Sequence, residues 1–171
     1  MIDPILEEKF INWYEQYADA IFRYCYFRVN NRELAKELVQ ETFIRVFEYF
    51  KKHEIENIKP FLYKVALNLV IDYSRQKRIK EISLEELYEK QGFEPVSSSS
   101  LEIIISSLEI KNILQSLNQL KEDDHQVIMM RYFDGLEPKE IAEILNENSN
   151  IISVRLNRAV KKLRELLLKK I

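Results

Sequence analysis

The sequence predicts an all-α protein made of two small helical domains joined by an acidic linker. Only two Gly and four Pro occur among its 171 residues, which leaves few of the tight turns that β-hairpins need. Apolar residues recur at spacings of three and four along several segments, as they do in amphipathic helices. Residues 1–80 and 110–171 each carry a net charge of +2, whereas residues 81–109 carry −6. We therefore expect domains over 1–80 and 110–171, with the linker over 81–109.

The composition argues against several classes of protein. One cysteine, Cys25, and two histidines in the whole chain cannot supply the ligands of a structural zinc site, and a core position in a reducing compartment suits Cys25. No apolar run approaches the roughly 18 residues of a membrane span, and the N-terminus lacks the basic-then-apolar order of an export signal. We expect a cytoplasmic protein with no metal ion or cofactor.

The segment 32–51 is predicted to form one long amphipathic helix, with Asn31 as its N-cap. Apolar residues recur along it at three and four: Leu34, Leu38, Phe43 or Val39, Val46, Phe47 and Phe50. The opposite face is polar and includes Glu37, Gln40 and Glu41. Taken alone, such a face is usually no more than solvated.

The next helix is predicted to open at Pro60, whose missing N–H costs nothing in a first turn, and to continue through residues 61–73. Its expected apolar face comprises Phe61 or Leu62, Val65, Leu69 and Tyr73. A polar stripe follows one side of it: Lys64, Asn68, Asp72 and Arg75. With the basic run 75–80, this stripe can follow a phosphate backbone and offer one amide to base edges. The alternative is an ordinary wet face with a basic last turn.

The acidic segment 81–109 has the character of a linker. It contains Gly92, Pro95 and the run Ser97–Ser100, which favour turns and low-complexity chain. Its seven acids and one lysine offer little apolar surface to repay ordering, so we expect an extended segment in the free protein. Leucines and isoleucines near its two ends favour short helices there.

The C-terminal part carries the most informative pattern. A short apolar-periodic helix is predicted over 137–145, followed by a polar break at 146–150 and a basic helix that contains seven Lys or Arg residues against the single acid Glu165. Two helices joined by a tight polar turn, the second of them basic, are typical of a helix-turn-helix. DNA is therefore the first partner to consider.

Helical geometry assigns the faces of this second helix. At about 100° per residue, one stripe is expected to pack against Ile141 and Leu145: Ile152, Leu156, Ala159, Leu163 and Leu166. The residues expected to face outward are Ser153, Val154, Asn157, Arg158 and Lys161. On that face, Arg158 and Lys161 suit phosphates, Asn157 suits an adenine edge and Val154 suits a thymine methyl group.

Three segments, in this order, resemble the small bacterial sigma-70-type initiation factors of the extracytoplasmic-function (ECF) group. They are ELVQETFIR at 37–45, FLYKVALNLVIDYSR at 61–75, and MRYFDGL at 130–136 continuing through RLNRA at 155–159. The resemblance covers almost the whole chain. It departs from the family pattern at Phe61, where Trp is usual, in the Asn-rich turn 146–150, and at Ser153 and Val154, where a basic residue and Ser are common.

The resemblance implies a non-enzymatic factor that binds core RNA polymerase and directs it to promoters, and an anti-sigma factor is a common partner in the family. It implies polymerase contacts at Glu37, Gln40 and Glu41. It implies that the loop 53–59 and the following helix hold the opened −10 element, through Tyr63, Lys64, Asn68, Asp72, Arg75, Lys77 and Arg78. It implies that the helix-turn-helix contacts the −35 element through Arg131, Ser153, Val154, Arg155, Asn157, Arg158 and Lys161.

Two points stay open from the residues alone. Phe61, Tyr63 and Tyr73 can stack on unpaired bases, at roughly 1–3 kcal/mol per base, or they can belong to the core, as large aromatic residues on helices usually do. A dimeric helix-turn-helix regulator that binds an operator is the alternative to a sigma factor. An enzyme has little support, because the two histidines are isolated and no glycine-rich phosphate loop occurs.

Overall fold

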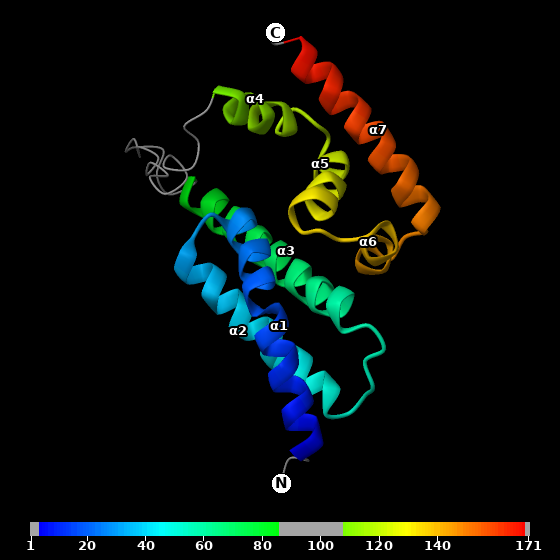
Figure 1. The fold of residues 1–171 in the computed structure, drawn as a ribbon. Coiled ribbons are helices and arrows are strands. Elements are labelled where there is room, and N and C mark those ends of the chain that lie inside the picture. The colour runs from blue at the N-terminus through cyan, green and yellow to red at the C-terminus, as the bar shows by residue number, and fades with distance from the viewer. Residues whose placement is uncertain (1–3, 86–107, 170–171) are drawn as a thin grey trace. The chain divides into compact units, whose positions relative to one another are not determined.

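The computed structural model describes residues 4–85 and 108–169, and every regular element in these two ranges is a helix (Figure 1). The chain divides into two compact units, unit 1 over Met1–Pro95 and unit 2 over Val96–Ile171. Within the described residues, no helix is both long enough and apolar enough to cross a membrane. The prediction of an all-α fold with two helical domains is confirmed.

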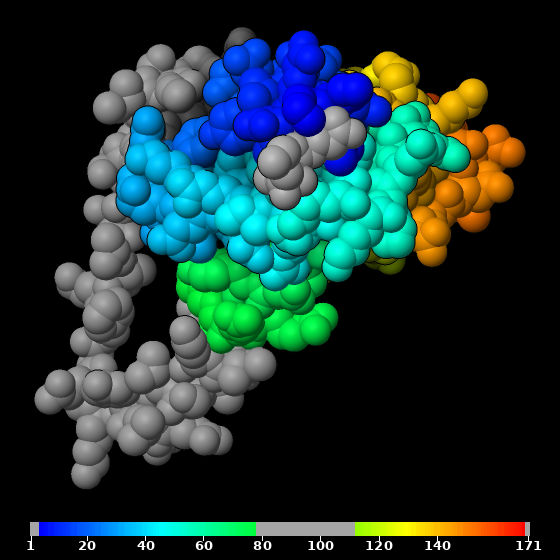
Figure 2. All heavy atoms as spheres, turned by 90° about the horizontal axis from the view of Figure 1, so that it is seen from below, coloured from blue at the N-terminus to red at the C-terminus, as the bar shows by residue number. Residues whose placement is uncertain are grey.

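Unit 1 consists of three helices that contact one another in pairs: α1 (Pro4–Val29), α2 (Arg32–Phe50) and α3 (Ile58–Glu85). Asn30 has a left-handed backbone (φ 48°) that ends α1. Asn31 then caps α2 by accepting a hydrogen bond from the Leu34 N–H at 3.0 Å, which confirms the predicted N-cap. The short connection makes α1 and α2 neighbours, as Figure 2 shows for α1 in blue beside the cyan atoms of α2 and the start of α3.

Aromatic rings hold the three helices of unit 1 together. The Trp13 ring lies 4.5 Å from Phe50, and the Phe10 ring lies 4.7 Å from Phe47, both between α1 and α2. Cys25 is fully buried in the same core. Burying rings of this size provides much of the hydrophobic stabilisation of a small domain.

The structure corrects the predicted start and apolar face of α3. The helix begins at Ile58, so Pro60 lies inside the first turn, where a missing N–H still costs nothing. The buried residues are Leu62, Tyr63, Ala66, Leu67, Leu69 and Val70. Phe61, Val65 and Tyr73 are only half-buried. Because α3 packs against both α1 and α2, its buried face is wider than the single stripe that was expected.

Unit 2 contains α4 (Leu108–Leu117), α5 (Glu122–Ile128), a five-residue π-helix η1 (Met129–Phe133), α6 (Pro138–Leu145) and α7 (Ser149–Leu168). Its core includes Leu117, Val127, Met130, Leu136, Ile141, Ile152 and Ala159. After η1 the chain turns at Gly135, where a positive φ of 66° suits a residue without a Cβ. Helix α7 packs on α4, α5 and α6.

Both ends of the predicted linker 81–109 are helical, as the leucines and isoleucines near them favoured. Helix α3 continues through residue 85, and α4 begins at residue 108, so the two ends of the segment are helical. The remaining residues, 86–107, lie outside the described part of the chain, and the expectation that they are extended stays a prediction.

Candidate nucleic-acid interface

The turn between α6 and α7 forms with asparagines where glycine is common. Asn146 ends α6 in the left-handed conformation (φ 54°, ψ 45°), which asparagine tolerates better than most residues. The Glu147 N–H donates to the Ala142 carbonyl at 2.9 Å. Asn148 then caps α7, with its side-chain oxygen accepting from the Asn150 N–H at 2.8 Å. The predicted helix-turn-helix therefore forms, and α7 begins at Ser149.

The start of α6 is held by a reciprocal capping arrangement. Pro138 occupies the first turn, and the Glu137 N–H donates to the Glu140 carboxylate at 2.8 Å. Arg131, on η1, donates to the Leu136 carbonyl at 3.2 Å and to the Glu137 carboxylate at 3.0 Å. These bonds tie η1 to the start of α6, and the predicted contact of Arg131 with DNA stays a prediction.

The outer face of α7 carries most of the predicted contacts. Ile152, Leu156 and Ala159 are buried, as expected. Val154 is 66% exposed, and Asn157, Arg158 and Lys161 are exposed as well. Ser153 is half-buried, and its hydroxyl donates to the Ser149 carbonyl at 3.0 Å. A largely apolar hollow of about 320 Å³ lies beside the first two turns, lined by Asn150, Ile151, Val154, Arg155 and Arg158.

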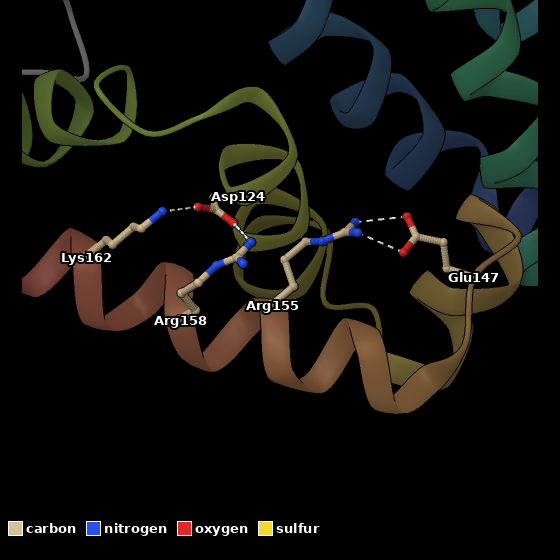
Figure 3. Close-up of polar contacts among 5 residues, drawn as sticks. All are labelled: Asp124, Glu147, Arg155, Arg158 and Lys162. Atoms are coloured by element: carbon tan, nitrogen blue, oxygen red, sulfur yellow. Dashed lines mark hydrogen bonds and ion pairs between the residues drawn. The ribbon is translucent and has the colours of Figure 1, made fainter.

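Arg155 does not belong to this outer face. Its guanidinium makes two parallel hydrogen bonds to the Glu147 carboxylate, at 2.9 and 2.8 Å, and its side chain is only 18% exposed (Figure 3). The hydrogen bond that Arg155 donates to Glu147 raises the pKa of Arg155 above its usual value, although burial opposes it. In this structure Arg155 therefore fastens the turn to α7, and its contact with the −35 element stays a prediction.

A second acid, Asp124 on α5, forms ion pairs with two cationic side chains of α7. Arg158 donates to one carboxylate oxygen of Asp124 and Lys162 donates to the other, each at 2.9 Å. Burial alone would raise the pKa of Asp124. The hydrogen bonds from Lys162 and Arg158, together with their charges, outweigh burial and lower that pKa. Figure 3 shows both cations reaching from α7 to this one side chain.

The polar stripe of α3 in unit 1 is accessible. Asn68, Asp72, Arg75 and Lys77 are exposed and Lys64 is half-buried, whereas the side chain of Arg78 lies outside the described part. Tyr63 is different, because it is 2% exposed and its ring meets that of Tyr24 edge-on at 5.1 Å. Its predicted contact with the −10 element is therefore wrong for this conformation: the ring belongs to the core.

Sequence reasoning missed an aromatic group at the loop between α2 and α3. The Tyr49 ring lies 4.5 Å from His53 and 4.9 Å from Phe61, and Tyr49 and His53 are exposed. Residues 49 and 53 are four apart, but α2 ends between them, so helical periodicity did not connect them. A hollow of about 490 Å³ lies between residues 52–56 of this loop, Phe50 and the start of α1.

The polar face of α2 contains one apolar residue that the sequence analysis did not single out. Glu37 and Gln40 are exposed, and Glu41 is half-buried and paired with Arg45 at 2.7 Å. Ile44, three residues after Glu41, is 57% exposed. A single exposed aliphatic side chain is normal on a protein surface and does not by itself mark a binding site.

Two helical units, the second built around a helix-turn-helix with an accessible outer face, define a DNA-binding protein of the transcription machinery. The model of Sigma-70 region 2 matches residues 13–79, and the model of Sigma-70, region 4 matches residues 110–163. The chain belongs to the sigma-70 family of transcription initiation factors, in its extracytoplasmic-function group. Sigma factors are not enzymes, which agrees with the sequence prediction.

Individual relatives extend over nearly the whole chain. The ECF RNA polymerase sigma factor SigW of Bacillus subtilis is 29% identical, over 94% of this chain and 90% of its own length. The ECF RNA polymerase sigma factor BldN of Streptomyces coelicolor is 27% identical, over 94% of this chain and 61% of its own length.

Two solved structures share the fold. The sigma factor RpoE, in complex with the anti-sigma factor NepR from Bartonella quintana, has a TM-score of 0.66 at 21% identity, over 94% of this chain and 97% of that one. CnrH, in complex with the cytosolic domain of CnrY, also has a TM-score of 0.66, at 18% identity, over 94% of this chain and 88% of that one.

Proposed function

We propose that this chain carries core RNA polymerase to promoters, opens the −10 element with unit 1 and reads the −35 element with α7. The observation that carries the proposal is the outer face of α7, where Val154, Asn157, Arg158 and Lys161 are accessible on a properly capped recognition helix. Such a helix enters the major groove with its N-terminal part. Because bacterial polymerase works in the cytoplasm, we place the factor there.

At the −35 element, contacts divide into positioning and readout. Lys161 and Arg158 suit phosphates, which fix the register of the protein on DNA. Asn157 can donate to and accept from an adenine edge, and Val154, beside the apolar hollow, can meet a thymine methyl group. We therefore expect a preference for A·T pairs opposite these two residues, with Ser153 in a supporting position at the start of α7.

At the −10 element, the exposed stripe of α3 supplies Asn68 for a base edge and Lys64, Arg75 and Lys77 for the backbone, with Asp72 between them. The aromatic group of Tyr49, His53 and Phe61 replaces Tyr63 in this proposal, because two of its members are exposed. Stacking on such rings offsets part of the lost duplex stacking, at roughly 1–3 kcal/mol per base.

The polymerase contact is assigned to α2. Glu37, Gln40 and Glu41 lie on the accessible face of α2, in the two turns that precede the exposed Ile44, and polar residues beside an apolar side chain suit the edge of a protein interface. An anti-sigma factor is a second proposed protein partner. It is supported by one structural neighbour, the sigma factor RpoE, whose solved complex contains the anti-sigma factor NepR.

In vitro transcription tests the proposal directly. Core polymerase with this chain should produce transcripts from a promoter library randomised at both elements, whereas core polymerase alone should produce none above background. Size-exclusion chromatography should show a monomer that co-elutes with the core enzyme. A free dimer that binds duplex operators and does not associate with the core enzyme would show that the protein is a conventional regulator.

A further inference from the structure

Asp124 is the most completely buried acidic side chain that the structure describes in unit 2, and it lies far along the sequence from both of its partners. Its side chain is 1% exposed, whereas those of Arg158 and Lys162 are 56% and 40% exposed. The carboxylate thus lies beneath α7 while the two cations reach from the helix surface down to it (Figure 3). Both cations present one side to a buried acid and the other side to solvent.

Each cation has donors to spare. The structure shows one guanidinium nitrogen of Arg158 and the ammonium of Lys162 donating to Asp124. A guanidinium has five N–H donors and an ammonium has three, so both groups can hold the buried carboxylate and a phosphate oxygen at once. Long, flexible side chains lose rotamer freedom when they bind. Because Asp124 already holds the side chains of Arg158 and Lys162, these two lose less rotamer freedom when DNA binds.

We infer that Asp124 is a positioning residue for DNA: it holds Arg158 and Lys162 in place to receive the phosphates that flank the bases facing Asn157. This inference rests on the proposed reading of the −35 element by α7. It adds Lys162 to the DNA-contacting set, and it gives α5 a part in recognition although α5 presents no cation of its own to DNA.

Asp124 could affect DNA binding through its own negative charge or by positioning the two cations, and these two roles predict opposite changes in affinity when Asp124 is neutralised. If the carboxylate acted only through its charge, removing it would raise the affinity for every duplex, because DNA is a polyanion. If it positions the two cations, removing it weakens the specific complex, in which the phosphates have fixed places, and spares loose binding, in which they do not. The signs of the two effects therefore separate them.

The experiment uses the full-length chain assembled on bacterial core polymerase, with the core enzyme alone as the blank. A preferred −35 duplex is first selected from a randomised library with the wild-type protein. Affinities for that duplex and for a scrambled duplex are then measured over a series of salt concentrations for wild type, Asp124→Asn and Asp123→Asn. Asp123 is the exposed neighbour of Asp124, so its substitution changes the net charge equally and leaves the two ion pairs in place.

We expect Asp124→Asn to lose roughly tenfold in affinity for the selected duplex, about the effect of one charged hydrogen bond, and to bind the scrambled duplex at least as well as wild type. Log affinity decreases with log salt, and on the selected duplex this decrease should become less steep by about 1 to 2 units of slope, because each lost phosphate contact contributes about 0.9. Asp123→Asn should keep both the preference and the slope. If the two variants behave alike, the inference is overturned.

A second variant keeps the test decisive if Asp124→Asn fails to fold. Lys162→Met retains the alkyl chain and leaves Asp124 paired with Arg158, and it should lower the salt slope by about 1. An unchanged salt slope in Lys162→Met would contradict the inference without any use of Asp124→Asn. Where Asp124→Asn does fold, adding Lys162→Met to it should cause little further loss, and fully additive losses would contradict a shared mechanism. A wild-type protein with no preference for any duplex would refute the proposed −35 readout itself, and the inference would fall with it.

Discussion

Asn157 is the exposed amide on the outer face of α7, between the hollow at Val154 and the cations that follow. Asn157→Ala should flatten the preference at a single base pair of the −35 element, by about 1–3 kcal/mol of discrimination. Lys161→Ala is the comparison, because loss of a phosphate contact should weaken all sequences about equally. Binding to a −35 library measures both. An unchanged sequence profile in Asn157→Ala would show that another residue reads the bases.

Asp124 gives unit 2 a specific dependence on pH. Its pKa in the folded protein is lowered from the value of about 3.9 that an unfolded chain has. The stabilisation is therefore complete above that unfolded value and is lost as the pH falls through the lower, folded value. Below both, the carboxyl is protonated in either state and contributes nothing.

Thermal unfolding followed by circular dichroism from pH 2 to pH 7 checks this linkage. Asp124→Asn should lower the melting temperature at pH 7 by more than Asp123→Asn does, because its two partners lose a buried acceptor. The difference between the two variants should shrink in acid. A difference that stays constant over the whole range would mean that the ion pairs of Asp124 do not stabilise the fold.

Helix α2 is the element on which polymerase binding depends in the proposed function. The double substitution Gln40→Ala, Glu41→Lys should abolish association with the core enzyme, because it removes one amide and reverses one charge among the side chains that are proposed to contact the polymerase. The fold should persist, since Gln40 is exposed and the lost pair of Glu41 with Arg45 is a partly exposed pair one helical turn apart, of a kind that contributes about 0.3–0.5 kcal/mol. Co-elution with core polymerase and a native circular dichroism spectrum measure the two effects.

The matched control for α2 is Glu15→Lys, a charge reversal at an exposed position of α1. It should leave core binding intact. Equal core affinity in the double variant and in wild type would move the polymerase contact to another face of unit 1.

Periodicity predicted the elements better than it predicted which of their residues are buried. The spacing of apolar residues located α2, α3 and the helix-turn-helix, and the turn chemistry of asparagine anticipated Asn146 and Asn31. In α3, however, the run 61–71 is apolar on most of its circumference, so spacing alone did not distinguish the buried Tyr63 from the half-buried Phe61. The packing of α3 against two helices decides between them.

Some ion pairs could not be predicted because the partners are distant in sequence. In the sequence Arg155 is one more cation of a basic helix, whereas in the structure Glu147, eight residues earlier, accepts two hydrogen bonds from it. Asp124 precedes Arg158 by 34 residues and Lys162 by 38. No local pattern connects residues so far apart. The π-helix η1 was likewise not anticipated by a period of 3.6.

At the scale of the whole molecule, each unit has a core of its own. Trp13, Tyr24 and Val46 are buried in unit 1, and Met130, Ile141 and Ile152 are buried in unit 2. A domain with its own core can fold alone. Separately expressed residues 1–95 and 96–171 should therefore each give a helical spectrum and a cooperative thermal transition. A fragment that becomes helical only after the other is added would show that the units fold as one.

The single cysteine of the chain, Cys25, is fully buried on α1 in the core of unit 1. A thiol-reactive dye can reach Cys25 only when the helices of unit 1 separate. The rate of labelling therefore measures the opening of unit 1 and is insensitive to unit 2. The natural sequence thus contains its own kinetic reporter. A partner that binds and stabilises unit 1 lowers the labelling rate of Cys25, whereas a ligand of unit 2 does not. The two kinds of ligand can thus be distinguished without an engineered label.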